Sequence, residues 1–344
     1  MNFDFEFQQK HLIIGAGILF LTGAIAFSQL ADTGLEPQDE GTDVVATFYP
    51  LYTLSEEVAG EETSVSSLVP PGTDPHSFEP SPQDIQRLND ADIFVVTGAE
   101  FEEWEKNLVE SVDESVEIVR PAESIELIEI DDSHGEEHHE EEHHGNETHG
   151  EEHHEEEHHE EEHHGEDHHE GHDHGPYDPH YWLSPANAEV IAEEVSQALQ
   201  NEDPENSEAY SSNLEDFRSE VQSLDSDFQE GLQGCELDSI LVTHAAFSYL
   251  GEDYGFSQVQ ITGLGHLTEP TAQELENLQE QASEHGIEHI FYDSMVDSSV
   301  ADTIAEGVDA EVMVLNSIEG AKEEPYIDLM RENLDNLETA LQCR

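Results

Sequence analysis

Segments of strand and helix character alternate along most of this chain, and this alternation constrains its fold more than any other feature of the sequence. Short runs rich in β-branched and aromatic residues end at turn-forming residues, and most are followed by segments whose apolar residues recur at helical spacing. This order predicts parallel βαβ units and an α/β fold class. The strands are expected at residues 44–48, 64–69, 92–97, 116–119, 240–243, 258–261, 289–292 and 312–315.

A helical pattern of unusual length separates two groups of four expected strands. Residues 205–231 carry apolar side chains three and four positions apart, which places them on one stripe of a helix. We therefore expect two parallel-sheet α/β lobes joined by this helix, with a ligand-binding cleft between the lobes. The expected divisions are residues 1–42 (signal or anchor segment and linker), 43–130 with 176–204 (N-terminal lobe), 131–175 (His- and Glu-rich loop), 205–233 (bridging helix) and 234–344 (C-terminal lobe).

The chain is extremely acidic. It has 84 Asp and Glu residues against eight Lys and Arg, and a formal net charge of −76. Self-repulsion of this size is costly in dilute buffer and is largely screened at ~1 M salt, where the Debye length is ~3 Å. The composition therefore predicts very salty surroundings, such as those of a halophilic microbe. It also excludes nucleic acid and anionic lipid as partners, because few basic residues are present to neutralise phosphates.

The N-terminal region predicts export from the cytoplasm. Residues 12–27 form an apolar run that is short for a spanning helix and typical of a signal peptide, with a small-x-small cleavage site at residues 26–28. If it is not cleaved, the same segment could tether the protein to the membrane. In an oxidising compartment the only two cysteines, Cys235 and Cys343, could form one disulfide or remain two buried thiols.

One internal tract has the composition of a metal-binding loop. Residues 134–174 contain 16 His and 18 acidic residues and no apolar or basic side chain. Such a tract cannot bury a core, and neutral imidazoles are favoured ligands of zinc and neighbouring metals. Its histidine pairs follow a five-residue repeat, which is neither a helical nor a strand period, so we expect weak, exchangeable binding of several metal ions. The alternative is a solvated acidic spacer.

Three further histidines stand at expected strand ends or in the turns that follow them. They are His76, His180 and His244, and each taken alone is more often a structural histidine. Zinc in proteins takes about four ligands, so three histidines at strand–helix junctions supply most of a zinc site. His266 is expected in a loop at the rim of the same cleft.

Short motifs around these histidines resemble one known family. The motifs are TFYP at residues 47–50, PHSFEPS at 75–81, DPHYW at 178–182, THAAF at 243–247 and VLN at 314–316. In this order and spacing they resemble the zinc-binding, substrate-capturing component of ABC importers for zinc and manganese. The resemblance covers residues 43–344, and a His- and acid-rich loop before the second histidine is typical of the zinc-specific branch.

The resemblance implies a specific function. It implies two α/β lobes rigidly bridged by one long helix, with Zn²⁺ bound between them by His76 and His180 of the first lobe and His244 of the second. It also implies delivery of Zn²⁺ to an ABC permease with its ATPase, no catalysis, and a monomer outside the cytoplasm. Manganese-type relatives usually have Glu where His244 stands and Asp where Asn316 stands, so His244 favours zinc. The fourth ligand could be Asn316, water or an open position.

The sequence also leaves two rival functions open. Three histidines with water in the fourth position are also a catalytic zinc pattern, so a zinc hydrolase is one rival, although no HExxH motif is present outside the His-rich tract. The second rival is an extracellular metal buffer or adhesin in which the His-rich tract carries the function. Deletion of the tract separates these hypotheses, because a receptor keeps one tight site and a buffer loses nearly all its capacity.

Overall fold

The structure is a computed structural model, and it describes residues 41–60, 63–99, 101–130, 175–260, 272–284, 286–293, 295, 298–320 and 324–344. The expected signal segment, the His-rich tract of residues 134–174 and His266 lie outside the described residues.

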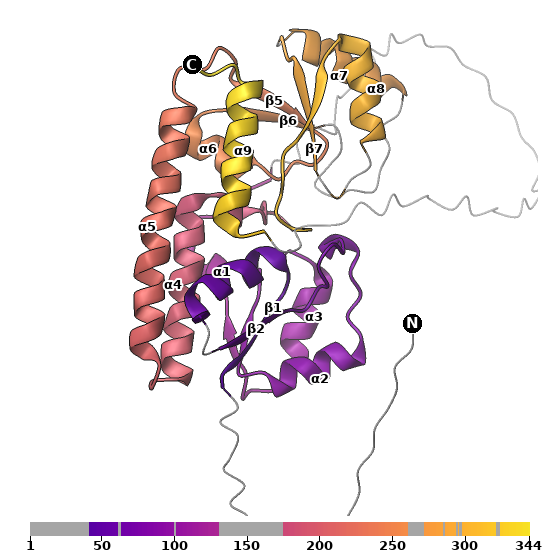
Figure 1. Cartoon of the computed structure of the whole chain (residues 1–344). Helices are drawn as coiled ribbons and strands as arrows, with labels where there is room; N and C mark the ends of the chain where they lie inside the picture. Colours follow the sequence, from indigo (N-terminus) through magenta and orange to yellow (C-terminus); the bar gives the residue numbers. More distant parts are fainter. Residues whose placement is uncertain are drawn as a thin grey trace, which may run out of the picture. The chain divides into compact units, whose positions relative to one another are not determined.

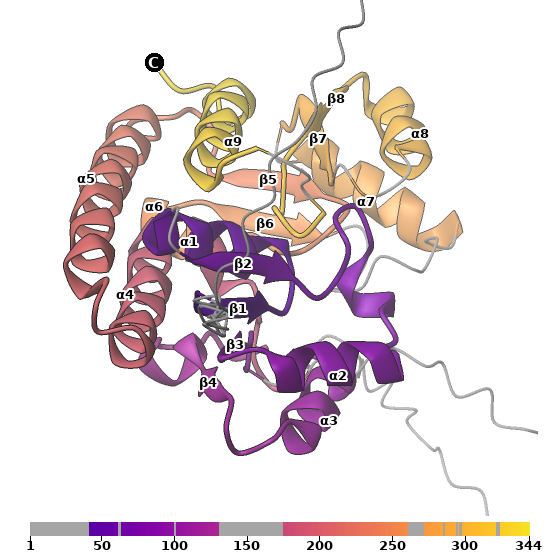
Figure 2. The ribbon, with the colours of Figure 1, turned by 60° about the horizontal axis from the view of Figure 1, so that its bottom comes forward.

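The first sheet is a four-stranded parallel sheet with the strand order β2-β1-β3-β4 (Figure 2). Short apolar runs form its two central strands, and these strands are buried on both faces, as expected for parallel sheets. The strands are β1 (Asp43–Ala46), β2 (Ser64–Ser67), β3 (Ile93–Val95) and β4 (Glu117–Val119).

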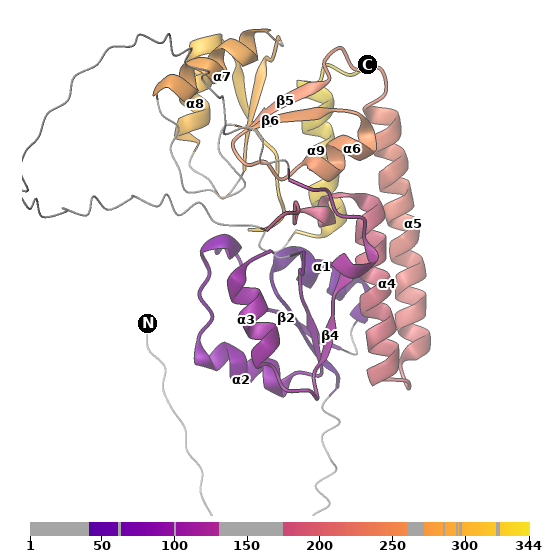
Figure 3. The same cartoon turned by 180° about the vertical axis from the view of Figure 1, so that it is seen from behind.

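Helices cover both faces of this sheet. Successive side chains of each strand point to opposite faces, so neighbouring residues pack against different helices. Val45 and Phe94 point into a cluster that includes residues of α2 and α3, whereas Val44 and Val95 point into the core formed with α1 and α4. Figure 3 shows α2 and α3 on one side of the strands and α4 on the other. The helices are α1 (Tyr49–Ala59), α2 (Pro82–Asp90), α3 (Glu103–Ser111) and α4 (Pro185–Glu202).

Helix α5 (Ser207–Gly231) is the expected long helix, and it packs against helices of both lobes. Its apolar stripe is completely buried, and it contacts α1 and α4 at one end and α9 (Tyr326–Ala340) at the other (Figure 1). The stripe consists of Tyr210, Leu214, Phe217, Val221, Leu224 and Phe228. The helix therefore bridges the two lobes, as the apolar pattern predicts.

The second sheet repeats the topology of the first, with four parallel strands in the order β6-β5-β7-β8. Leu241 and Ile290 pack on the side of α7 and α8, and Val242 joins the core shared with α5, α6 and α9. The strands are β5 (Ser239–Val242), β6 (Ser257–Gln260), β7 (His289–Tyr292) and β8 (Glu311–Val314). The remaining helices are α6 (Ser248–Tyr254), α7 (Ala272–Glu284) and α8 (Ser299–Val308).

Buried hydrogen bonds also join the two lobes. The indole Nε1 of Trp182 donates to the carbonyl oxygen of Ser317 over 2.9 Å, and the hydroxyl of Tyr326 donates to the carbonyl oxygen of Trp182 over 2.9 Å. The hydroxyl of Tyr249, on α6, donates to the carbonyl oxygen of Asp178 over 2.8 Å. Because one continuous apolar core also includes residues of both sheets, the lobes are tied together by packing as well as by polar contacts.

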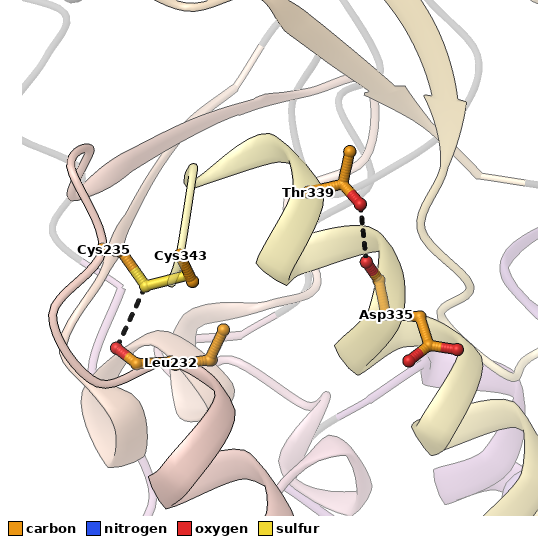
Figure 4. Close-up of a disulfide and its surroundings, with 5 residues drawn as sticks. All are labelled: Leu232, Cys235, Asp335, Thr339 and Cys343. Carbon is orange, nitrogen blue, oxygen red and sulfur yellow. Dashed lines mark hydrogen bonds between the residues drawn. A yellow bond between two sulfur atoms is a disulfide. The ribbon is translucent and has the colours of Figure 1, made fainter.

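The two cysteines form the expected disulfide, so the alternative of two unpaired thiols is wrong. Cys235 follows the end of α5 and Cys343 follows the end of α9, so the bond joins the beginning and the end of the second lobe (Figure 4). Cys235 Sγ also lies 3.1 Å from the carbonyl oxygen of Leu232.

Every expected strand is present, with ends that differ from the predicted ones by at most two residues. Several strands end one or two residues earlier than predicted. Thr47 and Thr243, for example, lie just beyond β1 and β5, although their backbone N–H groups still bond to the neighbouring strands. Among the helices in the described ranges, none has both the length and the apolar character needed to cross a membrane.

Candidate metal centre

His76 lies in a 3-10 turn, Pro75–Ser77, in the connection between β2 and α2. The carboxylate of Asp74 fixes the start of this turn by accepting a 2.9 Å hydrogen bond from the backbone N–H of His76. Its ring nitrogen Nδ1 lies 2.9 Å from Oε1 of Glu102, which orients the ring, and the His76 side chain is buried. The opposite nitrogen, Nε2, therefore points into the space between the lobes.

His180 is held in a similar way by a neighbouring carboxylate. One oxygen of Asp178 lies 2.9 Å from the backbone nitrogen of His180 and 2.6 Å from its ring nitrogen Nδ1. The turn Tyr181–Leu183 follows, and the N-cap Ser184 then accepts from the backbone N–H of Asn187 to begin α4. His180 is fully buried, and the orientation imposed by Asp178 directs its Nε2 toward the second lobe.

His244 and Glu319 come from the second lobe. His244 lies two residues beyond the end of β5, and its ring centroid is 4.9 Å from that of His180 and 5.9 Å from that of His76. Glu319 lies between β8 and α9 and is also buried. Together these four side chains, hereafter the metal centre, each offer one ligand atom, and the four atoms lie within 4.8 Å of one another: His76, His180, His244 and Glu319.

The distances from the three imidazoles to the carboxylate of Glu319 are close to those between ligands of a tetrahedral metal ion. The Nε2 atoms of His76 and His244 are each 3.5 Å from a carboxylate oxygen of Glu319, and that of His180 is 3.1 Å away. A tetrahedral zinc ion with bonds of ~2.0–2.1 Å requires ligand atoms ~3.3–3.4 Å apart. Three imidazoles and one carboxylate, with ligand atoms within 4.8 Å of one another, are therefore a set of ligands that suits Zn²⁺.

The charges in the metal centre are strongly coupled. Burial alone lowers the pKa of His76, but the charge of Glu319 and the hydrogen bond to Glu102 outweigh it and raise that pKa to about 10. Burial likewise opposes a charge on His180, and Asp178 with Glu319 raises its pKa to about 9. For Glu319, burial raises the pKa, but the neighbouring His76 and His244 hold it well below its usual range. In the metal-free centre, protonated His76 and His180 therefore lie next to the ionised, buried carboxylate of Glu319.

Of the predicted residues, the structure brings together all three histidines and adds Glu319, which sequence analysis missed. The side chain of Asn316 instead stabilises the turn in which it lies. Its oxygen accepts a 2.7 Å hydrogen bond from the backbone N–H of Ile318. No motif marks Glu319, which is one of 84 acidic residues and lies in an irregular segment. His289 begins β7, as expected, and lies outside the metal centre.

Two parallel α/β lobes with a buried centre of three imidazoles and one carboxylate define a two-lobed metal-binding protein. A family model agrees with this class: "Zinc-uptake complex component A periplasmic" matches residues 44–340. The chain belongs to that family.

Known proteins of similar sequence and structure are named as zinc-uptake or zinc-binding proteins. The chain is 34% identical over 305 residues to the high-affinity zinc uptake system protein ZnuA of Bacillus subtilis, covering 87% of each chain. It is 31% identical to the zinc-binding lipoprotein AdcA of Streptococcus pneumoniae, covering 93% of this chain but only 60% of AdcA. The Zn(II)-bound ZnuA-like domain of that AdcA superposes with a TM-score of 0.68 at 28% identity, over 88% of this chain and 99% of the domain.

Proposed function

We propose that this chain is an extracytoplasmic receptor that captures Zn²⁺ in the metal centre and delivers it to an ABC permease with its ATPase. The observation that carries the proposal is the convergence of three Nε2 atoms on the carboxylate of Glu319 at 3.1–3.5 Å. The ligands are His76, His180, His244 and Glu319.

The chemistry of the ligands favours zinc over manganese. Imidazole nitrogens suit zinc, whereas manganese prefers oxygen ligands and a coordination number of about six. Two of the three rings are also held by carboxylates on Nδ1, from Glu102 and Asp178, an arrangement that fixes the ring orientation of zinc-ligating histidines.

The partners and the location follow from the family. Membership in the periplasmic component A family of zinc-uptake complexes supports a role outside the cytoplasm and transfer of the bound ion to membrane partners. Residues 12–27 would then act as the export signal or as a tether. We further propose that the receptor acts as a monomer and that the His-rich tract raises the local zinc concentration beside His180.

We also propose that the protein performs no catalysis. A catalytic zinc site keeps a position open for water or substrate, whereas a structural site is closed by four protein ligands. Here the carboxylate of Glu319 stands in the fourth position, and the side chains of the metal centre are almost completely buried. A substrate would have to displace a charged ligand, which argues against the hydrolase.

Zinc affinity measured in high salt by competition with a chelator tests this function. The wild-type chain should bind one Zn²⁺ tightly and Mn²⁺ weakly, and His244→Ala should abolish tight binding because it removes one of four ligands. His289→Ala is the matched control, since this histidine begins β7 outside the metal centre and should leave zinc affinity unchanged. Equal affinities of the wild type and His244→Ala would refute the assignment.

A second variant, lacking residues 133–175, separates the receptor from the metal buffer. If the metal centre carries the function, this variant keeps one tight zinc site and loses only the weaker ones. Loss of all tight binding together with the tract would support the buffer instead.

A further inference from the structure

The segment that presents Glu319 is held in a conformation that its own sequence disfavours. We call residues 316–319 the Glu319 turn; it lies between β8 and α9. Ile318 has a φ of 71°, in the left-handed region, and is fully buried. A β-branched residue is rarely found there, so the surroundings must impose the conformation.

Asn333, on α9, makes the most complete contact with this turn. Its side-chain oxygen accepts a 2.8 Å hydrogen bond from the backbone N–H of Asn316, and its Nδ2 donates over 2.8 Å to the carbonyl oxygen of the same residue. The amide therefore satisfies both backbone groups of Asn316, as a neighbouring strand would. Asn333 is only 1% exposed, so water cannot replace either bond.

Two other elements hold the next residue of the turn. The backbone N–H of Ser317 donates to Oδ2 of Asp293, at the end of β7, over 2.9 Å. The carbonyl oxygen of Ser317 accepts from Nε1 of Trp182, in the first lobe. Three side chains, those of Asn333, Asp293 and Trp182, thus bond to the backbone of the Glu319 turn. Of these, only Asn333 is both uncharged and part of the same lobe as the turn.

We propose that Asn333 is a positioning residue that determines metal specificity by holding Glu319 close to the three histidines. This inference rests on the proposed function of the metal centre. A fixed turn keeps four ligand atoms at tetrahedral spacing, which suits Zn²⁺. If the turn loosens, Glu319 moves away, water enters, and the centre becomes more suitable for the six-coordinate Mn²⁺.

Asn333→Leu tests the proposal, because leucine has a similar size and makes neither hydrogen bond. In the full-length chain, with free zinc set by a chelator, we expect zinc affinity to fall about 10- to 100-fold, as for other residues that orient metal ligands. Manganese affinity should stay within about 3-fold of the wild type. With Co²⁺ as a probe, the intense visible absorption of a tetrahedral site should weaken.

Asn336→Leu is the matched control. Asn336 lies on the same helix, and its Nδ2 donates over 3.1 Å to the carbonyl oxygen of Val314, at the end of β8, outside the Glu319 turn. This variant should lower the melting temperature of the metal-free protein but leave the ratio of zinc to manganese affinity and the Co²⁺ spectrum unchanged.

The outcomes are distinct. Wild-type zinc affinity and an unchanged Co²⁺ spectrum in Asn333→Leu would show that Asn333 is merely structural, and equal changes in both variants would do the same. If Asn333→Leu does not fold, Asn333→Asp decides in its place, since it keeps the acceptor for Asn316 but loses the donor. Absence of tight zinc binding in the wild type would overturn the proposed function itself.

Discussion

Zinc binding should expel about two protons from this protein at pH 7.5. Both ring nitrogens of His76 and of His180 face carboxylate oxygens, an arrangement that stabilises the protonated ring. Their pKa values are raised to about 10 and about 9. A zinc ligand must be a neutral imidazole, so both protons have to leave when the metal binds.

The number of protons released follows from the pKa values of His76 and His180. At pH 7.5 a group with a pKa of 9 or 10 is almost fully protonated, so two such groups release about two protons, whereas two ordinary histidines with a pKa of ~6.5 would release only ~0.2. Release of two protons makes the apparent zinc affinity rise about 100-fold per pH unit between pH 7 and pH 8. The increase should disappear above pH ~10, where both rings are neutral.

Calorimetry at one equivalent of zinc, in buffers with different ionisation enthalpies, measures the number of protons directly. Glu319→Gln is the informative variant, because it removes the negative charge that raises the pKa of both histidines, and it should release fewer protons. A wild-type value near 0.2 would refute the reasoning, since the rings would then already be neutral in the metal-free protein.

Three further predictions concern stability. Cys235→Ser should lower the free energy of unfolding by about 2–5 kcal/mol in denaturant titrations, because the bond closes a loop with a sequence separation of 108; equal stability of oxidised and reduced wild type would contradict this. Tyr249→Phe should lower the free energy of unfolding by about 1–3 kcal/mol, because the buried carbonyl oxygen of Asp178 and the N–H of Ile128 lose their hydrogen bonds to the hydroxyl. An unchanged denaturation midpoint would show that other groups replace the hydroxyl. Lowering the salt from about 1 M to about 0.1 M should reduce the melting temperature, because a net charge of −76 is then less screened, and a melting temperature independent of salt would argue against the expected adaptation.

Sequence analysis was most successful where local patterns decide the structure. Alternating strands and helices and the apolar stripe of α5 depend on residues close together in the chain. The three histidines were identifiable because each lies in a short motif, although only His244 lies just beyond a strand end. The C-terminal ends of the strands were predicted less accurately, because several strands end one or two residues earlier than the sequence pattern indicates.

Glu319 could not be predicted in this way. Its position depends on Asn333, Asp293 and Trp182, which lie in three separate parts of the chain. Asn316 was considered because the family resemblance points to that position, but its side chain closes the turn to Ile318 and the ligand comes three residues later. A fourth ligand set by tertiary contacts leaves no periodic or spacing signal in a sequence so rich in acids.

The disulfide has a consequence for proteolysis. Cys235 and Cys343 close residues 235–343, which contain all four strands of the second sheet, into a covalent ring. A protease that cuts one peptide bond between residues 235 and 343 therefore opens the ring without separating the fragments. The nicked protein keeps its intact mass, apart from one added water, until a reductant is present, and His244 and Glu319 stay covalently connected even when the cut falls between them.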